Sequence, residues 1–145
     1  YKQAKYDLDN LQTRGNYKTG MEAYSLSKLA VILFTQELAE QLQGTGITAN
    51  VLHPGHVSSG MWDMWEKPKW YQRLLIGALR LFLSTPEKGA LTSIYLACSD
   101  QVAGITGKYF SKQKAVPVKS QYNTPEIQKQ LWELTHQRIP SGLFS

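Results

Sequence analysis

A long apolar helix followed closely by an apolar strand is the feature that most constrains this chain. Thr19 and Glu22 have the spacing of a capping box, which predicts a helix that begins there and runs to about Gln43. Residues 29–34 are apolar on every side, so this helix should be buried on most sides. Residues 47–53 follow as a β-branched strand. This order predicts an α/β fold with a doubly wound parallel sheet.

Tyr24 and Lys28 lie at the start of this helix, four residues apart and therefore on one face. A phenol beside an ammonium can act as a proton-transfer pair. A free phenol has a pKa near ~10, so acid–base work near neutrality needs about 4 kcal/mol of charge stabilisation. One cation about 4 Å away supplies a term of that size. The alternative is a solvated lysine beside a half-buried tyrosine.

The strand stops abruptly at Pro54 and Gly55. In open α/β sheets, ligands bind outside the C-terminal ends of the strands. We therefore expect a ligand to meet the loop of residues 56–59, directly after this turn.

Residues 60–83 form an aromatic segment with three competing interpretations. The segment could be a lid over an apolar substrate, a core or interface element, or a segment on a membrane surface. Its large side chains include Met61, Trp62, Trp65 and Trp70.

The remaining segments predict two more helices and one more strand. A helix should begin at Thr85-Pro86 and end near Ser99, and residues 107–110 should form a short strand. Residues 111–122 are expected to be a loop, before an amphipathic helix over residues 124–138. The inward side chains of that last helix should be Ile127, Leu131, Trp132 and Leu134.

Composition sets limits on the class of protein. The 145 residues are enough for a single domain, residues 1–145, and the net charge of +5 is scattered, which indicates solubility rather than nucleic-acid binding. The one cysteine, Cys98, excludes an internal disulfide and fits a reducing, cytoplasmic compartment; we expect it in the core. The histidines and Cys98 match no zinc spacing, so no metal site is predicted.

Three stretches resemble the short-chain dehydrogenase/reductase family, closest to its retinol-dehydrogenase-like members. They are residues 23–35 around Tyr-Ser-Leu-Ser-Lys, residues 51–59 around His-Pro-Gly, and residues 107–110 before the Leu131-Trp132 helix. The resemblance implies the C-terminal part of a Rossmann-like domain and an oxidoreductase that interconverts an alcohol and a carbonyl compound with NAD or NADP. A sugar-nucleotide epimerase or dehydratase shares the Tyr-Lys spacing, but the His-Pro-Gly loop argues against it.

The resemblance also implies a role for each matching residue. Tyr24 matches the catalytic tyrosine, which exchanges a proton with the substrate oxygen. Lys28 matches the lysine that favours the ionised tyrosine and hydrogen-bonds the nicotinamide ribose. The other implied cofactor contacts are Pro54, Gly55, Val57 and Ser59, the last standing where the family usually has threonine. Residues 60–83 match the variable substrate loop, whose apolar side chains favour a lipophilic alcohol or carbonyl compound.

The family's Gly-rich cofactor loop and catalytic serine lie upstream of the tyrosine, so we expect an N-terminal part to precede Tyr1. We accordingly expect these 145 residues alone neither to bind the cofactor tightly nor to turn over; membrane anchoring stays open. The alternative is a truncated, inactive relative that acts as an interaction module through helix 21–43, the same helix that would build a homodimer. The coding sequence upstream of Tyr1 separates the two.

Overall fold

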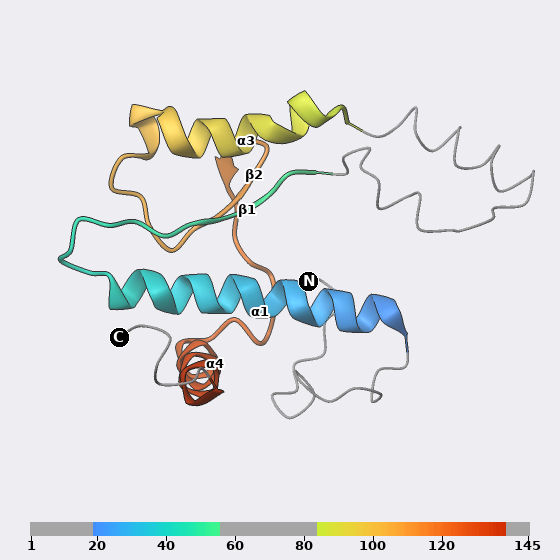
Figure 1. The fold of residues 1–145 in the computed structure, drawn as a ribbon, viewed down its shortest axis with the longest axis vertical. Coiled ribbons are helices and arrows are strands. Elements are labelled where there is room, and N and C mark those ends of the chain that lie inside the picture. Colours follow the sequence, from blue (N-terminus) through green and yellow to red (C-terminus); the bar gives the residue numbers. More distant parts are fainter. Residues whose placement is uncertain (1–18, 56–83, 139–145) are drawn as a thin grey trace, which may run out of the picture. The chain divides into compact units, whose positions relative to one another are not determined.

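The computed structural model describes residues 19–55 and 84–138, and Figure 1 shows the elements in chain order. These residues fall into two compact units. The helical unit contains residues 19–51, 104–109 and 116–138, and the hairpin unit contains residues 52–55, 84–103 and 110–115. Each unit is described below by itself.

Helix α1 (Gly20–Gln41) is the long element of the helical unit. The Thr19 hydroxyl accepts a hydrogen bond from the Glu22 N–H at 3.2 Å, so the predicted N-terminal cap is confirmed. The helix ends two residues before the predicted Gln43. Its middle is buried on most sides, as predicted, except at Val31, which is 51% exposed.

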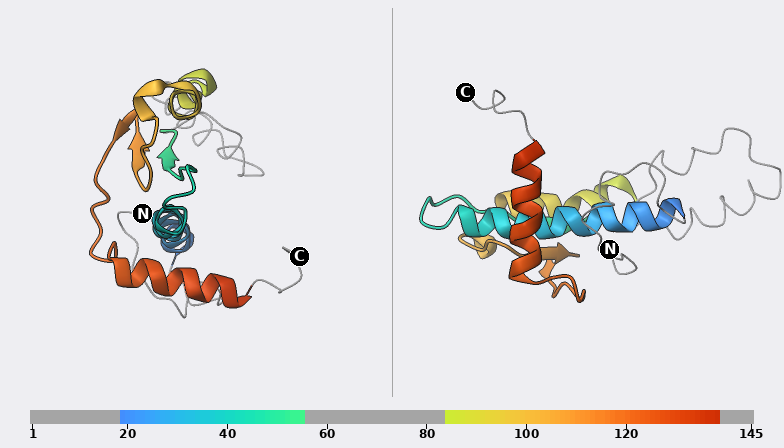
Figure 2. Two further views of the ribbon diagram at one scale, coloured as in Figure 1. Left: turned by 90° about the vertical axis from the view of Figure 1, so that its left-hand side faces the viewer. Right: turned by 90° about the horizontal axis from the view of Figure 1, so that it is seen from below.

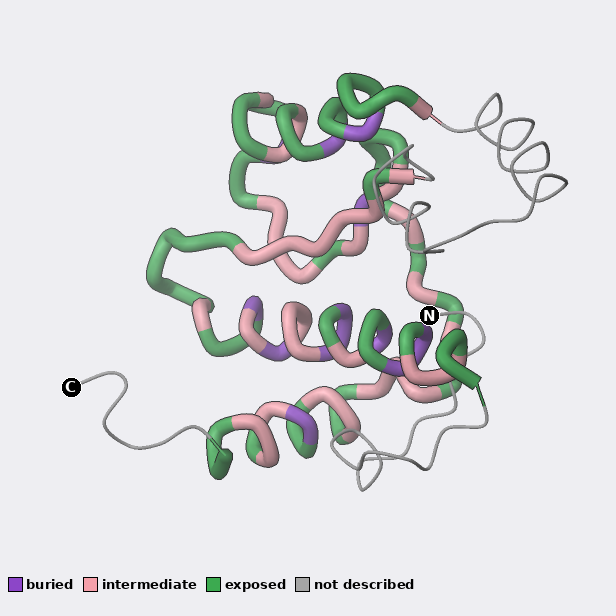
Figure 3. Tube along the Cα trace, turned by 45° about the vertical axis from the view of Figure 1, so that its right-hand side comes forward, coloured by how far each residue is buried: buried purple, intermediate pink, exposed green. Residues whose placement is uncertain are grey.

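Helix α4 (Pro125–Arg138) crosses α1, as Figure 2 shows. Leu131 of α4 packs with Leu29 and Leu33 of α1, and all three are buried. The Phe34 and Trp132 rings continue this contact with their centroids 4.9 Å apart. Figure 3 shows the buried positions recurring along α1 and once on α4. The predicted amphipathic helix is thus confirmed, with Leu131 as its one buried side chain.

The sheet has three short strands in the order β1-β2-β3. They are β1 (Val51–His53), β2 (Tyr109–Ser111) and β3 (Lys114–Ala115). The segments that lead into β1 and β2 run parallel, with bonds from Gly107 N–H to Ala49 O at 2.8 Å and from Val51 N–H to Lys108 O at 3.0 Å. The predicted α/β class is confirmed, although β1 is shorter than residues 47–53.

Strands β2 and β3 form an antiparallel hairpin. Residues 109–110 lie in the predicted strand, but Ser111 and residues 114–115 lie in the segment predicted to be a loop, so the loop prediction is wrong there. Lys112 (φ 51°) and Gln113 (φ 60°) form the two-residue turn. Positive φ at both positions is the geometry of a type I′ turn, which matches the twist of the flanking strands. The Gln113 N–H donates to the buried Thr92 hydroxyl of helix α3 (Pro86–Cys98) at 3.3 Å, which ties the turn to that helix.

Helix α3 (Pro86–Cys98) begins as predicted, with the Thr85 hydroxyl accepting from the Lys88 N–H at 3.4 Å. A short 3-10 helix, η3 (Asp100–Val102), follows it. Cys98 is exposed, so the prediction that it lies in the core is wrong. The physical reason is that α3 buries a different face, on which Gly89 and Thr92 are its buried residues.

Helices α3 and α4 begin with the same three letters, Thr-Pro-Glu. Hydrogen bonds, first with the residue's own backbone and then with the Thr85 side chain, lower the pKa of Glu87. The pKa of Glu126 is lowered in the same way, with Thr124 as the partner. An anionic side chain in the first turn also complements the helix dipole, so this tripeptide is a repeated helix start.

The contact between α1 and α4 predicts a large stability difference between two substitutions on α4. Leu131→Ala should lower the free energy of unfolding by about 2–5 kcal/mol, because it leaves a cavity against Leu29 and Leu33. Glu133→Ala, at an exposed position, should change it by less than about 0.5 kcal/mol. Urea denaturation of both variants measures the difference, and similar losses would contradict the proposed packing.

Candidate active site

The Tyr24 and Lys28 side chains lie together on an exposed face of α1. The Lys28 Nζ lies 5.4 Å from the centroid of the Tyr24 ring, within the range of a cation–π contact. The Tyr24 side chain is 48% exposed, and Lys28 is exposed as well. The helical spacing therefore brings the phenol and the ammonium together, as expected from four residues.

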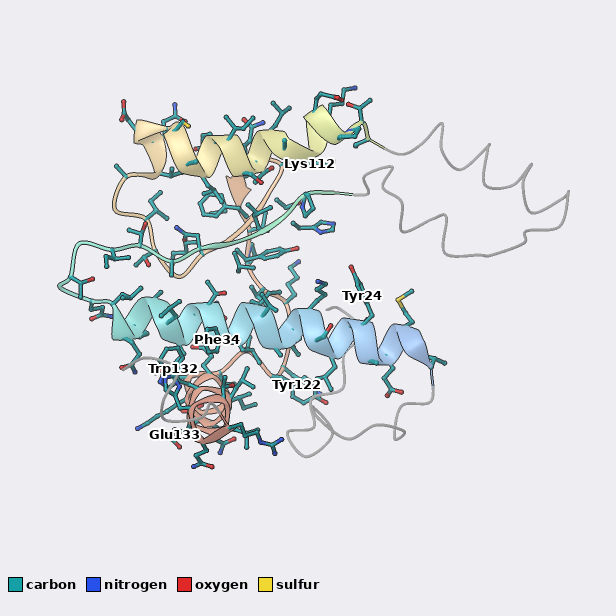
Figure 4. The ribbon with its side chains drawn as sticks, in the orientation of Figure 1. Tyr24, Phe34, Lys112, Tyr122, Trp132 and Glu133 are labelled. Carbon is teal, nitrogen blue, oxygen red and sulfur yellow. The ribbon has the colours of Figure 1, made fainter. Side chains whose placement is uncertain are left out.

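Local packing fixes the direction in which this pair projects. Ser25 and Leu26, the residues directly after the tyrosine, are buried. Since successive helical residues are about 100° apart, this burial leaves Tyr24 on the solvent side. Figure 4 shows Tyr24 standing off α1 on the side away from α4. The Ser27 hydroxyl donates to the Tyr24 carbonyl at 2.8 Å, so this serine is bound to the helix backbone.

The exposed pair presents two polar groups that can bind a ligand. A phenol both donates and accepts hydrogen bonds, and an ammonium only donates them. A molecule bound at this face could therefore exchange a proton with Tyr24 Oη, and Lys28 could donate to its hydroxyl groups.

The turn after β1 contains a glycine whose backbone conformation would be strained for any other residue. Gly55 has a φ of 87°, a region that residues with a Cβ rarely adopt. A Cβ built on Gly55 meets no atom within 4 Å among the described residues, so the space beside this turn is open there. The predicted contact Pro54 is exposed. The other predicted contacts lie outside the described residues: Val57, Ser59, Met61, Trp62, Trp65 and Trp70.

Asn50, four residues before Pro54 on the same segment, is a polar residue that was not predicted to belong to the site. Its carboxamide hydrogen-bonds backbone groups of Ile105 and Lys108. The available signal is the residue type itself, because asparagine is depleted in strands and here interrupts an apolar run.

Within residues 19–55 and 84–138, no three or more His, Cys, Asp or Glu side chains gather in a way that could hold a metal ion. None of the helices there is both long enough and apolar enough to span a bilayer.

Comparison with known proteins places the chain in a family. The profile of the family described as short chain dehydrogenase matches residues 13–70. Retinol dehydrogenase 14 of Mus musculus is 38% identical over 135 residues, which are 93% of this chain and 40% of the relative. Retinol dehydrogenase 11 of Mus musculus is 36% identical over 126 residues, covering 87% of this chain and 38% of the relative.

A third relative has a different name from the retinol dehydrogenases. The WW domain-containing oxidoreductase of Pongo abelii is 30% identical over 141 residues, covering 97% of this chain and 33% of the relative. No solved structure matches the chain. The chain therefore spans about two fifths of the length of the first curated relatives that it matches.

The matched profile and the similarity to these relatives define the class: the chain belongs to the short-chain dehydrogenase family. Within that family it is a retinol-dehydrogenase-like member, as the similarity to retinol dehydrogenases 11 and 14 indicates. The resemblance seen in the sequence is thereby confirmed.

The turn after β1 generates a prediction with a matched control. Gly55→Ala and Gly44→Ala should each lower the free energy of unfolding by about 1–2 kcal/mol, since both glycines have a positive φ and no atom of residues 19–55 or 84–138 lies near the added methyl group. Thermal denaturation of the two variants checks this. A much larger loss at Gly55 would show that a part of the chain packs against this turn and would contradict the openness described above.

Proposed function

We propose that the complete protein is an NAD(P)-dependent oxidoreductase that interconverts an alcohol and a carbonyl compound. The observation that carries the proposal is the position of the Lys28 Nζ, 5.4 Å from the centroid of the exposed Tyr24 ring. The relatives support it because their printed names are those of dehydrogenases and an oxidoreductase.

The described residues fit a nicotinamide cofactor in chemistry. The exposed Lys28 ammonium is a donor that suits ribose hydroxyl groups. Gly55 gives a turn without a Cβ, so the backbone there can be approached closely. On this proposal Lys28 and Tyr24 bind the ribose, and Pro54, Gly55, Val57 and Ser59 border the nicotinamide. When bound, the cofactor supplies the hydride chemistry, accepting or donating a hydride at carbon.

Tyr24 performs the proton step. In the oxidative direction the ionised Tyr24 Oη takes the proton from the alcohol oxygen while the alcohol carbon loses its hydride, which leaves a carbonyl. In the reductive direction the neutral phenol gives its proton to the carbonyl oxygen. Lys28 stabilises the ionised phenol by Coulomb attraction, and this contribution is largest where bound molecules exclude water.

The proposed substrate is a lipophilic alcohol or aldehyde. The two mouse relatives named above are called retinol dehydrogenases, and retinol is an apolar alcohol. The segment of residues 60–83 contains three of the four tryptophans of the chain, a composition that suits an apolar ligand.

Removal of a single oxygen atom tests the catalytic role of Tyr24. Tyr24→Phe in the complete gene product should lower kcat by about 10²–10⁴-fold, because the phenyl ring cannot transfer a proton. The ring that contacts Lys28 remains, so affinity for the cofactor should change by less than about tenfold. Steady-state turnover of a panel of alcohols and aldehydes, with NAD and NADP, measures both.

Tyr95→Phe is the matched control for Tyr24→Phe. It removes a hydroxyl on α3 whose hydrogen-bond partner among the described residues is an exposed glutamine, Gln101, at 3.3 Å. Turnover of this variant should stay close to that of the wild type. Comparable activity of Tyr24→Phe and Tyr95→Phe would refute the catalytic assignment.

The aromatic segment generates a prediction on substrate length. Replacing Trp62, Trp65 and Trp70 by alanine should raise KM about tenfold or more for long apolar substrates, because apolar contact area is lost. The KM for short alcohols and aldehydes should change far less. Kinetics over a series of chain lengths provide the measurement, and an equal effect at every length would rule out a substrate-binding role for these side chains.

A further inference from the structure

The pairing between the segments that lead into β1 and β2 contains a register offset of one residue. In a regular parallel ladder, the residue whose N–H bonds Ala49 O would also accept from the Val51 N–H. Here the Gly107 N–H bonds Ala49 O at 2.8 Å, but the Val51 N–H donates to Lys108 O at 3.0 Å. Two residues on one segment thus oppose Asn50 alone on the other, which is a β-bulge. Gly107 has a φ of 69°, as such an extra residue often does.

The Asn50 side chain occupies the ladder positions that this bulge disturbs. Its Oδ1 accepts from the Lys108 N–H at 3.0 Å, and its Nδ2 donates to Ile105 O at 2.6 Å. The one carboxamide therefore binds a donor and an acceptor on either side of Gly107. Serine cannot span both groups, and aspartate cannot donate to the carbonyl.

The neighbouring Thr106 holds the same two segments by a different bond. Its hydroxyl accepts from the Ala49 N–H at 3.0 Å and lies 3.3 Å from Ala49 O, to which it can donate. These bonds precede the bulge along both segments and do not involve Lys108. Thr106 is thus a matched control: it links the segments without fixing the extra residue.

We propose that Asn50 is a positioning residue that fixes the register of β1 and thereby the place of the Pro54–Gly55 turn at its end. β1 is only three residues long, Val51–His53, so the pairing directly before it has a large share in setting its register. A slip of one residue moves a strand by about 3.3 Å and exchanges its two faces. The inference rests on the proposed function in one respect, namely that this turn borders the nicotinamide.

The first test is amide hydrogen exchange, which does not depend on activity. In Asn50→Ala the Lys108 and Val51 amides should exchange at least about tenfold faster than in the wild type, since their register is released. In Thr106→Val they should exchange at nearly the wild-type rate. Faster exchange of these amides to the same extent in both variants would overturn the proposal, because Asn50 would then be one of several equivalent links.

The second test is kinetic and uses the complete gene product. Asn50→Ala should raise KM for the cofactor about tenfold or more, because a misplaced turn binds it poorly, whereas kcat at saturation should change by less than about threefold. Thr106→Val should leave both near wild type. Asn50→Asp, which retains the acceptor for Lys108, should fall between them and serves if Asn50→Ala does not fold. An unchanged cofactor KM in both Asn50 variants would refute the link to the turn.

The two tests separate this inference from the proposed function. A wild-type protein that turns over no alcohol or carbonyl compound would refute the function, and hydrogen exchange would still decide whether Asn50 sets the register. An active wild type with unaltered exchange in Asn50→Ala would leave the function intact and refute the positioning role.

Discussion

The packing of α4 across α1 is the contact on which the direction of the Tyr24–Lys28 pair depends. Leu29 and Leu33 are fully buried against Leu131, which fixes which face of α1 is turned inward. A helix with one face committed has no freedom to rotate, so the face that bears Tyr24 must point elsewhere. The apolar contact and the exposed position of the Tyr24 phenol are therefore two consequences of the same packing arrangement.

The sequence predicts the helices well because their signals are local. Thr19 and Thr85 are N-caps, and a hydroxyl followed by a helical apolar pattern marks a start independently of the rest of the fold. The hairpin at Lys112–Gln113 escapes prediction because its turn lacks the Asn-Gly or Asp-Gly pair that usually announces this geometry. The exposure of Cys98 could not be predicted, because composition shows that α3 is apolar but not which of its faces is covered.

The candidate site likewise has features that local sequence predicts and features that it does not. The closeness of Tyr24 and Lys28 follows from helical spacing alone, and the need for glycine at residue 55 follows from a sharp end to a strand. Asn50 could not be assigned from the sequence, because its role arises from a bulge formed with residues more than fifty positions away. Long-range register is set by pairing, which a single segment does not encode.

The exposed thiol on the last turn of α3 has a practical consequence. Cys98 is the one cysteine among the 145 residues, and it lies in the hairpin unit, whereas Tyr24 and Trp132 lie in the helical unit. A maleimide dye would therefore attach at a single known position without any prior mutagenesis. Energy transfer from Trp132 to such a dye, in a variant whose Trp62, Trp65 and Trp70 are replaced by phenylalanine, would follow the spacing of the two units in solution, with and without added dinucleotide.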